Sequence, residues 1–341
     1  MAPMNVFDTP SPALVVDASA FRRNVTTMSA ALPGRRLRPH VKAFKSTALA
    51  RELVAAGHDT FCCATVREME GMAAAAVGSD LLLANEVVGD SARRLGTLAR
   101  AVADHHLITG AVDSAATVEA LAAAGVRHVV VDVNVGLPRC GCAPDEAGVI
   151  ADLARSAGLE VRGVMGYEGH LMRAPAGDKA ARVEASMRLL RAAHDDVGGP
   201  LLTGGGTGTY DCNPWLNEIQ AGSYCLMDTE YVPHAPAFDI ALSILGTCIS
   251  TNEQAAVIDV GLKALGMDHG NPTVEGATCL FVSDEHTTIV REDGDPALPR
   301  VGDRVRVWPA HVDPTVAYHE RMYVADGESV IDVWPIDLRN W

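Results

Sequence analysis

Lysine is rare in this chain, and one of its four lysines stands where it could act as a nucleophile. Lys42 ends the strand-like run 36–42, and alternation along an extended segment puts it on the same face as His40. Unlike arginine, lysine can lose its proton and form a Schiff base with a carbonyl group. Lys45 has the opposite parity and begins a helix, so we expect it to be solvated. The alternative for Lys42 is a surface lysine in a loop.

Two glycine-rich segments could bind a phosphate group. Residues 203–209 read TGGGTGT, and residues 220–224 read QAGSY. Successive glycines expose backbone N–H groups, and the threonine and serine hydroxyls add further donors. A single glycine run can equally be a tight turn, but here it coincides with a second glycine and hydroxyl segment on the neighbouring strand-like run. A phosphate site together with a reactive lysine suggests pyridoxal 5′-phosphate, with Lys42 forming the imine.

A third candidate is the segment His311-Val312-Asp313. In an extended segment, residues two apart point the same way. One nitrogen and one carboxylate, with positions left for water and substrate, suit a divalent cation such as Mn²⁺, Mg²⁺ or Zn²⁺. Taken alone, the pattern also occurs by chance, here as a solvated turn before Pro314. Cys140 and Cys142 could begin a zinc site, but no second cysteine pair completes it.

The elements that must position these residues alternate between strand and helix from about residue 36 to 228. Eight nearly even units predict a parallel (β/α)8 barrel rather than an open, doubly wound sheet. Such barrels carry their chemistry at the carboxyl ends of the strands and often bind phosphate after strands seven and eight. The lysine and the glycine loops fall at these ends. The predicted strands are 36–42, 59–65, 80–88, 105–113, 127–135, 159–168, 200–207 and 218–228.

The pattern changes after about residue 236. Short alternating runs such as 255–260, 278–282, 287–290 and 304–309 are separated by Gly, Asp and Pro turns, and no long helix is evident. This is typical of an antiparallel β domain. We therefore predict a barrel domain over 18–235 and a β domain over 236–341, which the N-terminal strand 10–17 joins.

Composition excludes several classes of partner. Acidic side chains outnumber basic ones by 43 to 28, for a net charge of −15, whereas nucleic acids and anionic membranes recruit clustered cations. No apolar run approaches the ~20 residues that cross a bilayer. Residues 1–10 lack the basic and apolar regions of a signal peptide. We expect a soluble, cytoplasmic protein that binds neither nucleic acid nor membrane.

Together the motifs resemble the fold-type III pyridoxal-phosphate enzymes, the alanine racemase-like barrels. Within that family they are most similar to the metal-activated branch of D-threonine aldolases and D-serine dehydratases. The resemblance covers nearly the whole chain. The segments that carry it are 9–10 (TP), 13–17 (ALVVD), 38–42 (RPHVK), 85–89 (NEVVG), 139–141 (RCG), 204–208 (GGGTG), 220–224 (QAGSY), 259–263 (DVGLK), 284–286 (DEH) and 311–315 (HVDPT).

The resemblance implies a role for each candidate residue. Lys42 matches the Schiff-base lysine, and His311 and Asp313 match the metal ligands. Gln220 stands where racemases place an arginine facing the pyridine nitrogen, and this neutral partner makes the ring a milder electron sink. The other implied cofactor residues are Arg139 and Tyr167 beside the ring, and Gly205, Gly206, Thr207, Gly222, Ser223 and Tyr224 around the phosphate.

Aspartate at position 313 favours the aldolases, because the dehydratases usually have cysteine there. The expected reaction cleaves a D-3-hydroxy amino acid, with D-threonine giving glycine and acetaldehyde. One departure concerns the base. The aldolases usually place a histidine six residues after the tyrosine matched by Tyr167, where this chain has Arg173. His170, three residues after Tyr167, is the alternative base, or else a structural histidine, in which case a metal-bound hydroxide would be the base.

Two other functions remain open from the sequence. A D-serine or 3-hydroxy-D-aspartate dehydratase would use the same cofactor and metal, with Lys42 removing the α-proton. A non-catalytic pyridoxal phosphate-binding protein is the third reading, although single-barrel proteins of that kind lack the β domain and its His-x-Asp segment. The resemblance also implies a homodimer in which each β domain helps to close the partner's active site.

Overall fold

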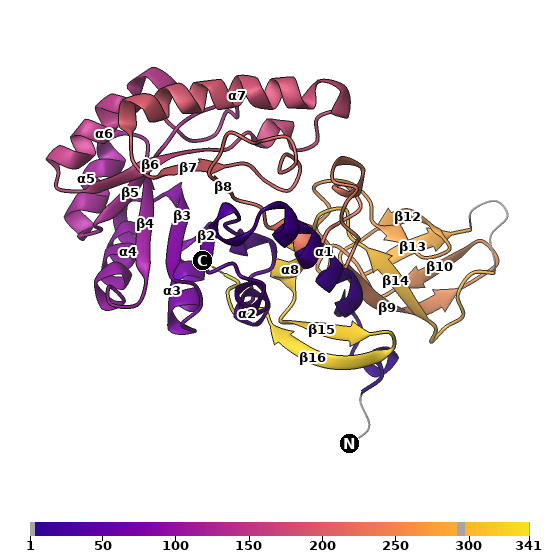
Figure 1. Cartoon of the computed structure of the whole chain (residues 1–341). Helices are drawn as coiled ribbons and strands as arrows, with labels where there is room; N and C mark the ends of the chain where they lie inside the picture. Colours follow the sequence, from indigo (N-terminus) through magenta and orange to yellow (C-terminus); the bar gives the residue numbers. More distant parts are fainter. Residues whose placement is uncertain (1–3, 292–296, 341) are drawn as a thin grey trace. The chain divides into compact units, whose positions relative to one another are not determined.

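The computed structural model describes residues 4–291 and 297–340, which form two compact units (Figure 1). We call them the barrel unit and the sheet unit. Residues 1–3, 292–296 and 341, which belong to the segments expected as N-terminus and β domain, lie outside this description. Residues 223–235 were expected in the barrel but group with the sheet unit. The barrel unit is Met28–Lys42, Ala50–Gly222 and Leu338–Trp341, and the sheet unit is Met1–Thr27, Ala43–Leu49 and Ser223–Asp337.

The barrel unit is built on a seven-stranded sheet in which strands follow one another in chain order. Every neighbouring pair is parallel, as the strand–helix alternation predicts. The strands are β2 (Thr60–Cys63), β3 (Asp80–Glu86), β4 (Leu107–Val112), β5 (His128–Asp132), β6 (Glu160–Gly166), β7 (Leu201–Gly204) and β8 (Glu218–Ile219). The helices are α2 (Thr47–Ala55), α3 (Val66–Ala74), α4 (Gly89–Ala101), α5 (Ala115–Ala124), α6 (Ala147–Ser156) and α7 (Ala176–Val197).

The predicted first strand, 36–42, is reduced to isolated bridges that link β8 to β2. Leu37 pairs with Ile219 and His40 with Cys62, and the N–H of Cys62 donates to the carbonyl of Pro39 over 2.9 Å. Proline has no N–H to donate, so a regular ladder cannot run through position 39. These bridges join the two ends of the sheet, and the predicted alanine racemase-type barrel architecture is confirmed. The eighth strand is also shorter than the predicted 218–228.

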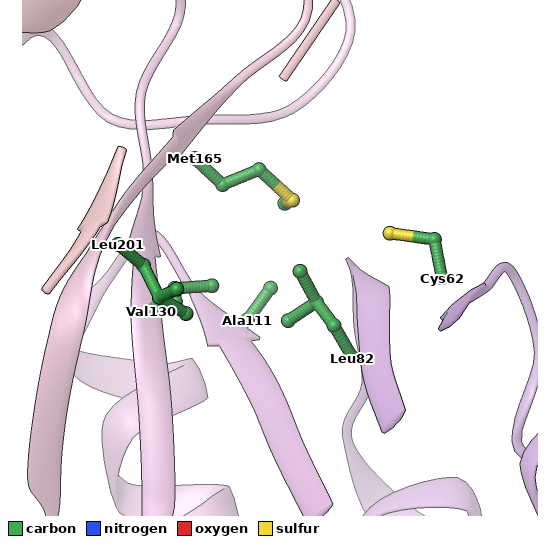
Figure 2. Packing of buried hydrophobic residues seen from close by; sticks show 6 residues of the cluster. All are labelled: Cys62, Leu82, Ala111, Val130, Met165 and Leu201. Carbon is green, nitrogen blue, oxygen red and sulfur yellow. The ribbon is translucent and has the colours of Figure 1, made fainter. Parts of the chain in front are cut away.

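The interior of the barrel is filled by a layer of buried side chains, one from each of the strands β2 to β7 (Figure 2). Alternate residues of a strand face the same side, so each strand sends one side chain to this layer. Full burial of a large aliphatic side chain stabilises the fold by about 1.5–3 kcal/mol. The layer consists of Cys62, Leu82, Ala111, Val130, Met165 and Leu201.

A buried ion network occupies the amino-terminal side of the same strands. The Nε of Arg38 donates to Glu218 over 2.7 Å, and its Nη1 donates to Asp80 over 3.1 Å. Arg162 donates to the second oxygen of Asp80 over 2.7 Å. The side chain of Arg38 is 1% exposed, so two cations and two carboxylates balance each other away from water. The buried ion pairs at this end of the barrel have a structural role.

The sheet unit contains a nine-stranded sheet with β1 in its interior, as expected for the N-terminal strand. Its pairings are antiparallel except that of β1 with β15, which is parallel. The strands are β1 (Ala13–Asp17), β9 (Leu242–Thr251), β10 (Ala255–Ile258), β11 (Thr273–Val274), β12 (Thr278–Val282), β13 (Thr287–Val290), β14 (Arg304–Trp308), β15 (Arg321–Asp326) and β16 (Ser329–Pro335). Helix α1 (Ala18–Ala31) follows β1, and helix α8 (Val312–Tyr318) lies between β14 and β15. No helix among the described residues is long and apolar enough to span a bilayer.

Candidate active site

Three of the predicted cofactor residues meet at the carboxyl ends of the barrel strands. Lys42 lies in the 3-10 turn Val41–Ala43, and its Nζ is 5.9 Å from the centroid of the Tyr167 ring. The guanidinium carbon of Arg139 is 5.5 Å from the same centroid. Tyr167 directly follows β6, and Arg139 lies in the loop after β5. An amine, a guanidinium group and an aromatic ring are therefore collected from three separate segments.

The first glycine loop, which follows β7, is held by a carboxylate that the sequence did not single out. Glu168 is fully buried and accepts hydrogen bonds from the Gly205 N–H at 3.2 Å, the Thr209 hydroxyl at 2.8 Å and the Asn213 amide at 2.8 Å. Burial raises the pKa of Glu168, and these hydrogen bonds oppose the shift. Because the carboxylate gathers donors from three positions of the loop, it determines the path of the backbone from 205 to 213.

The loop needs its glycines for close packing as well as for exposed N–H groups. A Cβ on Gly204 would lie 1.9 Å from the carbonyl oxygen of Gly166, and Gly205 has a φ of +70°. The N–H of Gly206 donates to the Thr209 hydroxyl over 3.3 Å, just as that of Gly205 donates to Glu168. These two N–H groups are thus bonded within the barrel unit.

The second loop follows β8, the strand paired with β7. Gln220 is buried, and its amide Nε2 donates to the Thr203 hydroxyl on β7 over 2.9 Å. The next residues are buried Gly222, then Ser223 and Tyr224 in the 3-10 turn Ser223–Cys225. Burial raises the pKa of Tyr224 well above its ordinary value, so its phenol stays protonated. Hydroxyls, N–H groups and a neutral amide at adjacent strand ends, together with the amine of Lys42, are the donor set that pyridoxal phosphate requires.

A pair of acids lies at the strand ends that border Arg139. Glu86 ends β3 and Asp132 ends β5. Burial and the charge of Glu86 raise the pKa of Asp132 well above its ordinary value, while Arg139 opposes this shift. Burial and Glu86 likewise raise the pKa of the Cys140 thiol to about 11. At neutral pH Cys140 is therefore a thiol.

His170, the predicted base, is exposed in the short turn Gly169–Leu171. Its ring lies against Gly136, where a Cβ would come within 2.8 Å of the ring carbon Cε1. Gly136 belongs to the loop that carries Arg139. Burial and the charge of Arg182 lower the pKa of His170, so the imidazole is neutral at physiological pH and able to accept a proton.

The sequence analysis expected His311 and Asp313 to lie in an extended segment, and this expectation is wrong. His311 precedes helix α8 with extended backbone angles, and Asp313 lies in the first turn of that helix. The reason is a capping interaction from a distant residue. Buried Asp228 accepts hydrogen bonds from the N–H groups of Val312 and Tyr231, each at 2.8 Å. Burial raises the pKa of Asp228 to about 6, and these two hydrogen bonds oppose the rise.

His311 has two polar neighbours that the sequence analysis missed. Its Nδ1 lies 2.7 Å from Oδ2 of Asp268, and its ring stacks on that of His269 with centroids 3.8 Å apart and planes within 10°. Burial favours a higher pKa for Asp268, but the hydrogen bond and charge of His311 lower it below its ordinary value. Donor atoms of Asp268, His269 and His311 all lie within 4.8 Å of one another. This imidazole and carboxylate chemistry fits a divalent cation.

Asp313, the second predicted ligand, contacts the loop after β8. The Ser223 hydroxyl donates to Oδ1 of Asp313 over 3.3 Å. Nothing in the spacing of the sequence signals Asp228, Asp268 or Glu168, because each acts on a residue far along the chain. Asp268 and His269 do follow the family segment 259–263 closely, which is the one local sign that they could matter.

Two known families together match most of the chain. The alanine racemase N-terminal domain matches residues 16–230. The putative serine dehydratase domain matches residues 241–325, a range that includes His311 and Asp313. The two matches follow the same order as the barrel and the sheet along the chain.

Full-length relatives point in the same direction. The chain is 34% identical to a D-threonine aldolase of Arthrobacter sp over 99% of its length and 94% of the relative. It is 31% identical to a 3-hydroxy-D-aspartate aldolase of Paracoccus denitrificans, with 97% and 92% covered. A D-threo-3-hydroxyaspartate dehydratase of Delftia sp. is 26% identical, with 97% and 98% covered. The crystal structure of D-threonine aldolase from Filomicrobium marinum superposes with a TM-score of 0.92 at 32% identity, covering 99% of this chain and 98% of that one.

Proposed function

The chain belongs to the family of the alanine racemase N-terminal domain, and on this premise we propose that it is a lyase that cleaves D-3-hydroxy amino acids with pyridoxal phosphate and a divalent cation. D-Threonine would give glycine and acetaldehyde. The observation that carries the proposal is an aspartate, Asp313, two positions after His311 in a chain whose 34% identical relative is a D-threonine aldolase.

The cofactor residues follow from the barrel. When bound, pyridoxal phosphate supplies an imine link to the substrate amino group and an electron sink for the charge left at Cα. Lys42 would hold it covalently, and the position of Lys42 beside Tyr167 and Arg139 supports this role. The phosphate would be bound by Gly205, Gly206, Thr207, Gly222, Ser223 and Tyr224. Of these, Gly205 and Gly206 already donate their N–H groups to Glu168 and to the Thr209 hydroxyl.

Gln220 would face the pyridine nitrogen as a neutral group. The Thr203 hydroxyl accepts from its amide Nε2, so the amide oxygen is the end left to meet a ligand. An amide oxygen accepts a hydrogen bond but carries no charge, so it favours a protonated nitrogen less than a carboxylate would. Lys42, Arg139, Tyr167 and Gln220 would thus lie around the cofactor ring, which would withdraw electrons only moderately.

His311 and Asp313 would hold the divalent cation. A bound cation lowers the pKa of a hydroxyl group that it contacts. Nitrogen and carboxylate donors suit Mn²⁺ or Mg²⁺ as well as Zn²⁺. His170 would then accept the proton of the substrate hydroxyl, and its lowered pKa supports a neutral, proton-accepting imidazole. The balance of the reaction is simple, because the hydroxyl becomes the aldehyde carbonyl, the Cα–Cβ bond breaks, and Cα gains one proton.

The second candidate function is a D-3-hydroxy amino acid dehydratase. It is supported by the 26% identity to the Delftia enzyme over 97% of the chain. In that reaction Lys42 would remove the α-proton and the hydroxyl would leave as water, and hydrolysis of the resulting enamine would give a keto acid and ammonia. Which bond breaks depends on the orientation of the substrate.

Product analysis separates the two. We would incubate the protein with Mn²⁺, pyridoxal phosphate and D-threonine, and test D-serine, L-threonine and D-3-hydroxyaspartate in parallel. Glycine and an aldehyde from D-isomers alone would establish the aldolase. Ammonia with a keto acid would assign the dehydratase instead. If no D-substrate reacted, the proposed activity would be wrong and only the family and fold would stand.

We also propose a homodimer, which the family resemblance suggests, and a cytoplasmic location. All eight cysteines are free thiols, as is usual in a reducing compartment. Light scattering after gel filtration tests the dimer directly, because a mass near 36 kDa rather than twice that value would contradict it. Fractionation of the native host tests the location.

A further inference from the structure

We propose that Asp268 is a positioning residue for His311: it accepts the Nδ1–H of the imidazole, so that Nε2 becomes the metal-binding nitrogen. This inference rests on the proposed role of His311 as a metal ligand. Asp268 lies 43 residues before His311 in the chain and was not among the residues expected at the site.

The hydrogen bond determines which nitrogen carries the proton. Both carboxylate oxygens of Asp268 lie close to Nδ1 of His311, at 2.9 and 2.7 Å. A carboxylate can only accept hydrogen bonds, so Nδ1 must be the donor. In a neutral imidazole the lone pair then lies on Nε2. Metal-bound histidines characteristically donate their other N–H to a carboxylate in this way, which orients the ring and raises the basicity of the ligand.

His269 packs against the ring of His311 and does not act as a third metal ligand. Its ring is stacked on that of His311 with centroids 3.8 Å apart and planes within 10°. A metal ion binds imidazole in the plane of the ring, at about 2.0–2.1 Å from the nitrogen for zinc. One ion cannot lie in two parallel planes that far apart. His269 therefore limits the rotation of the His311 ring. Asp313, two residues after His311 in the sequence, remains the second proposed metal ligand.

The loop that carries Asp268 is tied to the helix by contacts that do not involve the imidazole. The N–H of Gly266 donates to the Thr315 hydroxyl over 2.9 Å, and that hydroxyl donates to the carbonyl of His311 over 2.7 Å. A Cβ on Gly266 would come within 2.3 Å of Cγ of Pro314, so the two backbones pack closely. Asp268 is thus held in place beforehand, and its removal should leave the loop folded.

The test is a titration of the pyridoxal phosphate-loaded protein with Mn²⁺, in which the concentration of free Mn²⁺ is measured by electron paramagnetic resonance. Loss of a carboxylate partner of a metal-bound histidine weakens binding by about 10–100-fold, and we expect this of D268A. D268N keeps an oxygen that accepts from Nδ1–H, so its affinity should fall between those of D268A and the wild type. At saturating Mn²⁺, D268A should regain most of its kcat, because the ligands themselves are intact.

Matched variants keep the outcomes apart. D239A removes an exposed carboxylate paired with Arg23 in the same unit and should bind Mn²⁺ like the wild type. Unchanged binding in H311A would overturn the proposed metal site itself. Lost binding in H311A with unchanged binding in D268A and D268N would overturn only the role of Asp268. If H269A lost binding as completely as H311A, His269 would be a ligand and the assignment of Nε2 would be wrong. D268N serves as the test should D268A fail to fold.

Discussion

The hydroxyl of Ser223 donates a hydrogen bond to the carboxylate of Asp313 over 3.3 Å. Ser223 is the residue expected at the cofactor phosphate, and Asp313 is the residue expected at the metal. A hydroxyl can donate only one hydrogen bond, so Ser223 cannot donate to Asp313 and to a phosphate at once. Its backbone N–H is then the donor that Ser223 itself can offer to a phosphate.

Replacement of Ser223 should therefore affect the metal more than the cofactor. We expect S223A to weaken Mn²⁺ binding by about 10-fold, the low end of the range for a lost partner of a ligating carboxylate. Absorbance titration with pyridoxal phosphate should change less. T229A is the control, because Thr229 bonds the carbonyl of Pro309 rather than a predicted ligand. If S223A lost affinity for pyridoxal phosphate alone, the Ser223 hydroxyl would be assigned to the phosphate instead of to Asp313.

Lys42 should be required for the covalent link to the cofactor. Arginine keeps the positive charge but cannot form an imine, so K42R should bind pyridoxal phosphate without the visible absorption band of the Schiff base and lose activity. K45R, three residues later, should retain both. An intact band in K42R would assign the link to another lysine.

Removal of the metal should abolish activity without affecting the binding of pyridoxal phosphate. A chelator should abolish the cleavage of D-threonine while leaving the visible imine band unchanged, and added Mn²⁺ should restore activity. The reason is that Lys42 and the metal ligands lie on different segments, so the imine does not need the cation. Activity that survives exhaustive chelation would contradict a metal-dependent reaction.

Glu168 should matter for stability and for cofactor loading together. In E168A the donors on Gly205, Thr209 and Asn213 lose their acceptor. Each buried donor left unpaired costs about 1–3 kcal/mol, so the free energy of unfolding should fall by a few kcal/mol in urea titrations. The affinity for pyridoxal phosphate should fall as the loop loosens. Stability equal to that of the wild type would show that water replaces the carboxylate.

Asp80 should stabilise the barrel in a pH-dependent way. Burial alone would raise the pKa of Asp80, but Arg162 and Arg38 hold it below its ordinary value. A lowered pKa stabilises the folded state above the ordinary carboxyl pKa, and that stability is lost as the pH falls through the lower value. D80N should cost about 3–5 kcal/mol at neutral pH, because it leaves buried Arg38 and Arg162 short of a charge.

The stability difference between D80N and the wild type should shrink below about pH 4, where Asp80 of the unfolded wild-type chain protonates, and should be lost as the pH falls through the lower pKa of the folded state. D59N is the matched control, since Asp59 pairs with Arg35 in a much more exposed position. Such surface pairs contribute about 0–1 kcal/mol. Equal losses in D59N and D80N would contradict the importance of burial. Chemical denaturation at several pH values measures both.

Local pattern was enough to determine the architecture and the main chemical groups. Strand–helix alternation predicted the barrel, because the periods of strands and helices are properties of short segments. The end of a predicted strand located Lys42, and glycine-rich composition located the loops after β7 and β8. Short alternating runs predicted the β sheet. These are features that neighbouring residues determine among themselves.

Tertiary structure alone decided how the groups are held. Pro39 lacks an N–H, which reduces the predicted first strand to isolated bridges. Only the folded barrel determines that these bridges pair with β8 and β2. Asp228 caps the turn at Val312 and thereby puts Asp313 in a helix rather than an extended segment. Glu168 and Asp268 reach partners 37 and 43 residues away. Contacts over such separations depend on how the chain folds back on itself, and no spacing in the sequence encodes them.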